Sequence, residues 1–143
     1  MSAEKLEVCD IDPEVKTAAE KFRKRKEKTN GALIFKIDPS KQLVYVDELH
    51  DDISVEDLKE ELPEHLPVYI MYSYCQKHDD GRISYPLCFI FISPSGCKPE
   101  LQMMYAGSKL HVVKEVGATK VFELRSYEEF TEEWLLSKLA FFR

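Results

Sequence analysis

Three observations predict a single domain of the α+β, or mixed α/β, class. Segments with apolar residues at helical spacing are interleaved with short runs of branched and aromatic residues, which are typical of strands. The run Leu87–Ile92 shows no alternation of apolar and polar residues, so we expect a central strand whose sheet is covered by helices on both faces. No repeat, low-complexity stretch or linker divides the sequence, and the expected domain therefore spans residues 1–143.

The first predicted element is a helix that starts at Pro13. Asp12 can cap it, and the missing N–H of proline costs nothing at the first helical position. Apolar residues recur at helical spacing as far as Phe22 and form one narrow stripe that faces the core. We expect this helix to continue to Asn30–Gly31, a pair that favours a turn and so ends the helix.

A hairpin and a short acidic helix are expected next. Residues 32–37 and 43–46 have strand-like composition and are joined by the polar turn 38–41. Ser54 stands three residues before an aspartate, which is the spacing of a capping box, and Pro63 ends the helix that follows. One side of this acidic helix should face solvent.

A longer hairpin and the longest helix dominate the second half. Residues 68–76 and 82–93 form the two arms of the predicted hairpin, and Asp80–Gly81 supplies its turn chemistry. Pro99 begins the long helix and Gly117 ends it.

The chain is expected to finish with a strand and a helix. Residues 120–124 are rich in branched and aromatic side chains. Ser126 and Glu129 have capping-box spacing, so we expect the last helix to open at Ser126 and to continue through Trp134.

Charge and cysteine content restrict the function. The formal net charge of -6 argues against nucleic acid as the main partner, although residues 21–28 are strongly basic and residues 47–64 strongly acidic. No apolar run is long enough to span a bilayer, and the first residues lack the apolar core of a signal peptide. The four widely spaced cysteines fit reduced thiols, and we expect a soluble cytoplasmic protein.

No motif indicates catalysis, a cofactor or a metal. The cysteines and histidines contain neither C-x-x-C nor H-E-x-x-H, so we expect no metal site. His78 beside Asp79 and Asp80 offers one alternative, an enzyme with an imidazole general base. Turn chemistry explains these residues better, because neighbours in a tight turn point apart and no nucleophile is tied to them. We therefore predict a protein that is not an enzyme.

The long helix has two distinct sides. At about 100° per residue, one side can dock on the sheet; it carries Leu101, Met104, Tyr105, Ser108, Val112 and Val116. The nearly opposite side carries Met103, Gly107, Leu110 and Lys114. A flexible methionine beside a glycine suits helix-in-groove contact with another protein. The alternative is that a kinked or tilted helix buries this side as well.

Several motifs resemble the glia maturation factor family of the actin-depolymerising factor/cofilin homology superfamily. They are Phe22–Arg23–Lys24–Arg25–Lys26, His78–Asp79–Asp80–Gly81–Arg82, Ser84–Tyr85–Pro86–Leu87–Cys88–Phe89–Ile90–Phe91, Gly96–Cys97–Lys98–Pro99–Glu100 and Gln102–Met103–Met104–Tyr105–Ala106–Gly107–Ser108–Lys109. The resemblance covers essentially the whole chain. It implies the actin-depolymerising factor homology fold, with a central mixed sheet of five or six strands flanked by helices on both faces.

The resemblance also implies a function. Members of this family bind the actin-related protein 2/3 complex, inhibit branch nucleation and dissociate existing branches without hydrolysing nucleotide. Actin-binding relatives carry two lysines at the start of the long helix, where this chain has Glu100 and Gln102, so weak or no binding to actin itself is expected. The family name suggests an alternative, a kinase-regulating or growth-promoting signalling factor.

The resemblance implies two partner surfaces. We expect the chain to be a monomer that contacts the actin-related protein 2/3 complex and a neighbouring actin subunit. The partner-binding set is Ser2, Lys5, Lys98, Glu100, Gln102, Met103, Gly107, Ser108, Lys109, Leu110 and Lys114. The second surface is Arg23, Lys24, Arg25, Lys26, His78, Asp79, Arg82, Glu128 and Glu132. Phosphorylation of Ser2 should weaken binding to an acidic partner. The expected location is the cytoplasm at branched actin networks of the lamellipodium and cell cortex, with the nucleus as a second location.

Overall fold

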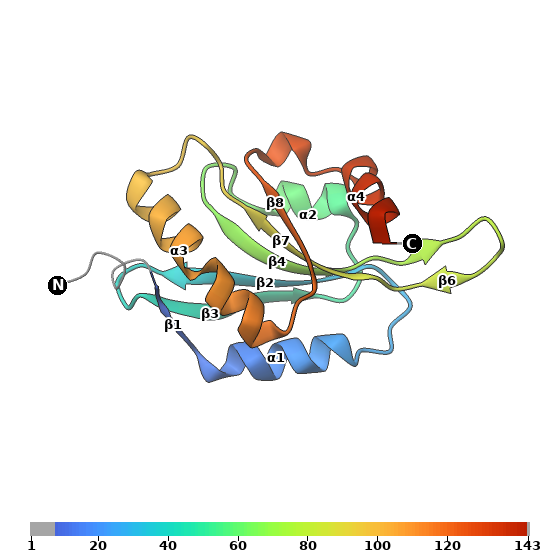
Figure 1. The fold of residues 1–143 in the computed structure, drawn as a ribbon, viewed down its shortest axis with the longest axis horizontal. Coiled ribbons are helices and arrows are strands. Elements are labelled where there is room, and N and C mark those ends of the chain that lie inside the picture. Colours follow the sequence, from blue (N-terminus) through green and yellow to red (C-terminus); the bar gives the residue numbers. More distant parts are fainter. Residues whose placement is uncertain (1–7, 143) are drawn as a thin grey trace.

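A six-stranded mixed sheet with helices on both faces organises the computed structural model, which describes residues 8–142 (Figure 1). In chain order the elements are β1 (Asp10–Ile11), α1 (Pro13–Arg23), β2 (Gly31–Asp38), β3 (Leu43–His50), α2 (Val55–Glu61), β4 (Val68–Ser73), β5 (Gln76–Lys77), β6 (Ile83–Ser84), β7 (Leu87–Ile92), α3 (Pro99–Val116), β8 (Lys120–Leu124), the 3-10 helix η2 (Tyr127–Glu129), α4 (Glu132–Leu139) and the 3-10 helix η3 (Ala140–Phe142). The predicted fold class is confirmed.

The sheet has the strand order β1-β3-β2-β4-β7-β8. The outer pairs β1·β3 and β7·β8 are parallel, and the pairs between them are antiparallel. Strand β7 lies between β4 and β8, which explains why Leu87–Ile92 is apolar without alternation. The predicted long hairpin is present, but its arms leave the main sheet, and β5 and β6 form a separate ribbon that projects at the right of Figure 1.

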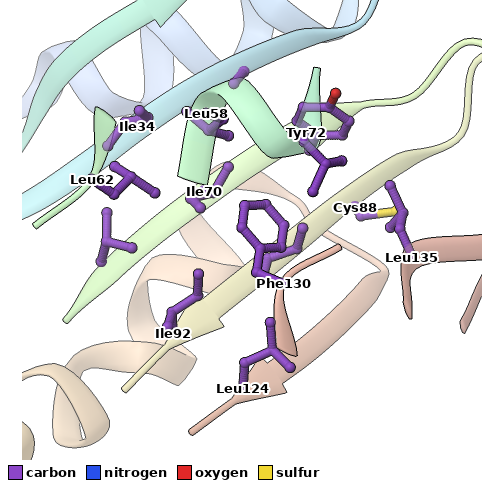
Figure 2. Packing of buried hydrophobic residues seen from close by; sticks show 14 of the residues in the cluster. Ile34, Leu58, Leu62, Ile70, Tyr72, Cys88, Ile92, Leu124, Phe130 and Leu135 are labelled. Carbon is purple, nitrogen blue, oxygen red and sulfur yellow. The ribbon is translucent and has the colours of Figure 1, made fainter. Parts of the chain in front are cut away.

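Alternate residues of the central strands point to opposite faces of the sheet and pack into two hydrophobic cores. In β4, Ile70 packs under α2 and α4 on one face, and Met71 packs under α1 and α3 on the other. Figure 2 shows the first core, where Leu58 of α2, Leu135 of α4 and Phe130, which directly follows η2, meet the sheet. Both helix-bearing faces are therefore needed to cover the central strands.

Two predicted helix boundaries were wrong. Helix α1 ends at Arg23 and not at Asn30, because Phe22 is its last buried residue and the charged residues after it have no apolar surface to bury. Ser126 caps only the single turn of η2, and Thr131 caps α4 through the backbone N–H of Trp134. The predicted last helix is thus two short helices.

Other signals are confirmed at the predicted residues. Ser54 accepts a hydrogen bond from the Asp57 N–H at 3.1 Å and caps α2. Helix α3 starts at Pro99, and Gly117 ends it with a φ of 70°, a left-handed conformation that favours glycine. Among residues 8–142, we find no helix with both the length and the apolar character that crossing a bilayer requires.

Candidate functional site

The outer side of α3 exposes apolar side chains to solvent. Tyr105, Val112 and Val116 are buried against the sheet, whereas Met103 is 53% exposed and Leu110 is 73% exposed. The predicted division of this helix into a docked side and an exposed side is therefore correct. The alternative in which a tilted helix buries Met103 does not hold.

Buried hydrogen bonds fix α3 on the sheet at the level of Met103. The Ile37 N–H donates to the Tyr105 hydroxyl at 3.0 Å, and the Tyr69 hydroxyl donates to the Tyr105 carbonyl. Burial raises the pKa of Tyr105 to about 12, so this hydroxyl keeps its proton at neutral pH. A rigid support under the exposed side lowers the entropic cost of binding.

Ser108 was assigned to the partner-binding set, but the structure places it inside the protein. Its side chain is fully buried, and its Oγ accepts a hydrogen bond from the backbone N–H of Cys9 at 2.9 Å. Burial also raises the pKa of the Cys9 thiol. Ser108 therefore holds the start of the described chain against α3 and does not itself face a partner. Ser2 and Lys5 lie outside the described residues.

Gln102 and Lys109 are engaged within the protein. The Gln102 amide donates to the carbonyls of Pro94, Ser95 and Cys97, at 3.0, 3.2 and 3.4 Å, and so ties the loop before α3 to the first turns of the helix. Lys109 forms an ion pair of 2.9 Å with Glu123 of β8.

The remaining members of the partner-binding set can reach a partner. Lys98, Glu100 and Lys114 are exposed together with Met103 and Leu110, while Gly107 is half-buried. We call these six residues the outer face of α3. Its centre is apolar, and its charges are at its ends.

The basic segment 23–26 is only partly available to a partner. The Arg25 guanidinium donates to the carbonyls of Thr29 and Asp51 at 3.0 and 2.8 Å, and its side chain is only 7% exposed. Arg23 donates to the Val116 carbonyl at the end of α3. The assignment of Arg25 to a binding surface is therefore incorrect, because the side chain links the loop after α1 to the loop before α2. Lys24 and Lys26 are exposed.

The projecting hairpin is ordered by its own polar side chains. His78 Nε2 lies 2.8 Å from Ser84 Oγ, and Arg82 forms an ion pair of 2.7 Å with Asp80. Hydrogen bonds from the backbone and side chain of Arg82 lower the pKa of Asp80. Ile83 is 52% exposed, and its exposure could not be predicted from the sequence because the strand is too short to show alternation.

The two glutamates of the predicted second surface lie in different places. The Tyr74 hydroxyl donates to Glu132 at 2.6 Å, and both residues line a hollow of about 450 Å³ with Lys77 at the base of the hairpin. Glu128 lines a separate hollow with Ser95, next to the loop before α3. The structure therefore joins Glu132 with the hairpin and separates Glu128 from it.

Comparison with known proteins identifies the family. The profile described as cofilin/tropomyosin-type actin-binding protein matches residues 8–140. The chain is 57% identical to human glia maturation factor beta over 140 residues, which covers 98% of this chain and 99% of the relative. The chain belongs to the glia maturation factor family. The glia maturation factor of Drosophila melanogaster is 52% identical and covers 93% of this chain and 96% of its own length.

Solved structures agree with this membership. The solution structure of glia maturation factor from Caenorhabditis elegans matches with a TM-score of 0.78 and 44% identity, over 92% of this chain and 95% of that one. Streptomyces griseoflavus cofilin also has a TM-score of 0.78, over 91% of this chain and 96% of its own, but at 18% identity it supports the fold alone.

Membership in this family also decides two broader predictions. The glia maturation factors are actin regulators and not enzymes, so the alternative of catalysis by His78 is set aside. The family also supports the prediction of a cytoplasmic protein that acts on the actin cytoskeleton.

Proposed function

We propose that this chain, acting as one domain over residues 1–143, binds the actin-related protein 2/3 complex, inhibits branch nucleation and promotes dissociation of existing branches. The observation that carries the proposal is the outer face of α3, where Met103 and Leu110 are exposed on a helix that is otherwise fixed to the sheet. Folding alone does not require apolar residues at these positions. Their exposure suits a helix that inserts into the groove of an actin-related subunit.

The same face supports weak or no binding to actin itself. Glu100 is exposed and negative, and the amide of Gln102 is held by the loop before α3. Neither residue offers the positive charge that the actin-binding relatives have at these positions. Loss of two such contacts against an acidic groove costs on the order of 1–3 kcal/mol, which is sufficient to change the preferred partner.

A second contact would explain dissociation of a branch. The hairpin of β5 and β6 and Glu132 lie near the end of the molecule that is opposite the start of α3 (Figure 1). If this end touches a neighbouring subunit or an actin at the branch, one rigid domain binds two subunits in a fixed relation. Binding would then favour a geometry that the junction cannot keep. Phosphorylation at Ser2 would weaken the first contact by adding negative charge.

The test compares two binding assays and one activity assay. Purified chain is captured with the actin-related protein 2/3 complex and, in parallel, sedimented with filaments, and labelled branches are followed by microscopy. We expect binding to the complex, little binding to filaments and shorter branch lifetimes. Met103→Asp should weaken binding to the complex. Leu49→Asp is its matched control, because Leu49 is 55% exposed on β3, beyond the two residues of that strand that pair with β1, and belongs to neither proposed surface. Binding to filaments without binding to the complex would overturn the proposal.

A further inference from the structure

Three side chains with metal-binding atoms meet at the edge of the sheet, and none of them belongs to the surfaces described above. Glu48 and His50 are two residues apart on β3 and therefore point to the same face, and Glu61 ends α2 above them. His50 Nε2 is 2.9 Å from Glu48 Oε2, and one ligand atom from each of the three residues lies within 4.8 Å of the others. The His50 side chain is 20% exposed and that of Glu48 is 51% exposed, so an ion can enter from solvent.

The two elements that carry these residues are held by the core. His50 and Glu48 pair with Ala32 and Ile34 of β2, which fixes their strand in the sheet. Leu58 of α2 is fully buried in the core beneath the helix. The segment between them is fixed as well, because the Ile53 N–H donates to the Asn30 carbonyl at 3.1 Å and the Tyr72 hydroxyl donates to the Ile53 carbonyl at 2.7 Å.

We propose that Glu48, His50 and Glu61 form a surface site for a divalent transition-metal ion, of which Zn²⁺ is the best match. Zn²⁺ binds imidazole nitrogen and carboxylate oxygen at about 2.0–2.2 Å, so neighbouring ligand atoms in its shell lie roughly 3.0–3.4 Å apart. Glu48 and His50 already have about this separation. The Glu61 side chain closes the remaining distance, less than about 2 Å, by rotation at the surface.

The donor set distinguishes this ion from the common hard cations. Ca²⁺ and Mg²⁺ prefer shells made of oxygen alone, and an imidazole in the set favours Zn²⁺ and its neighbours. Water completes the shell, as expected for three protein ligands. Because the ion joins the end of β3 to the end of α2, binding stabilises the folded state and raises the unfolding temperature.

Sequence motifs did not reveal this site, and no metal was expected. The spacing E-x-H matches none of the common zinc signatures, and the third ligand comes from a different element. The strand period places Glu48 and His50 together, but only the tertiary packing of α2 on the sheet brings Glu61 to them. None of the three residues belongs to a proposed partner surface, so the titration tests this site separately from binding to the actin-related protein 2/3 complex.

The test is calorimetric titration of the full chain with Zn²⁺ after treatment with a chelator, with Mg²⁺ and Ca²⁺ as comparison ions. We expect one Zn²⁺ per chain, and no displacement by millimolar Mg²⁺ or Ca²⁺. His50→Ala and Glu61→Gln should each weaken binding by at least about tenfold, because loss of a group that supports a metal already costs 10–100-fold. His65→Ala and Cys75→Ser are the controls, since they remove an exposed histidine and the most accessible thiol elsewhere.

A second measurement locates the ion. Mn²⁺ added to isotope-labelled protein should broaden the amide signals of the end of β3 and the end of α2 before any others, and Zn²⁺ should suppress this broadening. Zn²⁺ affinity that is unchanged in both His50→Ala and Glu61→Gln, or lost in Cys75→Ser, would overturn the proposal. Absence of Zn²⁺ binding to the unaltered chain at submillimolar concentration would do so as well.

Discussion

The outer face of α3 and the basic segment 23–26 both looked like binding surfaces in the sequence, yet they differ in what the fold requires of them. On α3, Met103 and Leu110 are exposed although the opposite side of the helix already supplies its packing. In the basic segment, Arg25 is nearly buried and donates to two carbonyl groups of neighbouring loops. A run of charged residues is therefore weaker evidence for a binding surface than an apolar residue on the side of a helix that faces water.

The difference separates residues that stabilise the fold from residues that are free for a partner. An arginine has five donors, and buried carbonyl groups at the ends of loops and helices can use them. An exposed methionine has no such internal role. Substitutions in the two regions should consequently affect different measurements.

The largest effect is expected for the double substitution Met103→Asp with Leu110→Asp. Charge at the centre of a groove-binding helix should weaken binding to the actin-related protein 2/3 complex by about thirtyfold or more, as for residues that dominate an interface. The free energy of unfolding should change by no more than about 1 kcal/mol, about 0.5 kcal/mol for each substitution, because both side chains are exposed. Equilibrium binding and urea denaturation measure the two quantities. Unchanged affinity would remove the outer face of α3 from the interface.

Arg25→Ala should give the opposite pattern. It leaves the carbonyl groups of Thr29 and Asp51 without this donor, so the free energy of unfolding should fall by on the order of 2–3 kcal/mol. Lys26→Ala is the matched control, since Lys26 is exposed, and its effect should stay within about 0.5 kcal/mol. Urea denaturation of both variants measures the two free energies of unfolding. Equal stability of the two would show that the Arg25 contacts contribute nothing to folding.

Ser108→Ala tests the boundary between the docked and outer sides of α3. Removal of the hydroxyl leaves the buried N–H of Cys9 without its acceptor, which should cost about 1–2 kcal/mol of stability. Affinity for the complex, measured where the variant is fully folded, should change by less than about threefold. A large loss of affinity with unchanged stability would mean that Ser108 contacts the partner directly.

The smallest effect is expected when positive charge is restored at the start of α3. Glu100→Lys with Gln102→Lys should strengthen co-sedimentation with filaments by roughly threefold to tenfold, which corresponds to about 1 kcal/mol. Gln102→Ala is the control, because it removes the hydrogen bonds to the Pro94–Cys97 loop without adding charge. If the control alone raised filament binding, the loop and not the charge would determine the preference.

Local rules predicted the parts of the fold that local chemistry determines. Pro99 and Gly117 bound α3 because proline and a left-handed glycine act within one turn of a helix. The apolar run of β7 indicated a strand covered on both faces. The two-residue strand β1 was missed, because a pairing with Leu43 and Val44 more than thirty positions away leaves no periodicity in so short a segment.

The candidate site shows the same limit. Helical periodicity placed Met103 on the exposed side, since exposure along a docked helix follows from spacing. The burial of Arg25 depends on its hydrogen bond to the Asp51 carbonyl, 26 positions away. The hydrogen bond from the Gln102 amide to the Pro94 carbonyl depends on the path of the loop that precedes α3. These are tertiary contacts, and composition gave no sign of them.

The most direct test of the central claim places a photoreactive amino acid at position 103, or at position 49 as a control, and irradiates each protein with the actin-related protein 2/3 complex. Mass spectrometry then identifies the cross-linked subunit. We expect efficient cross-linking from position 103 to an actin-related subunit and little from position 49. Cross-links absent from position 103 in a protein that still binds the complex would contradict it.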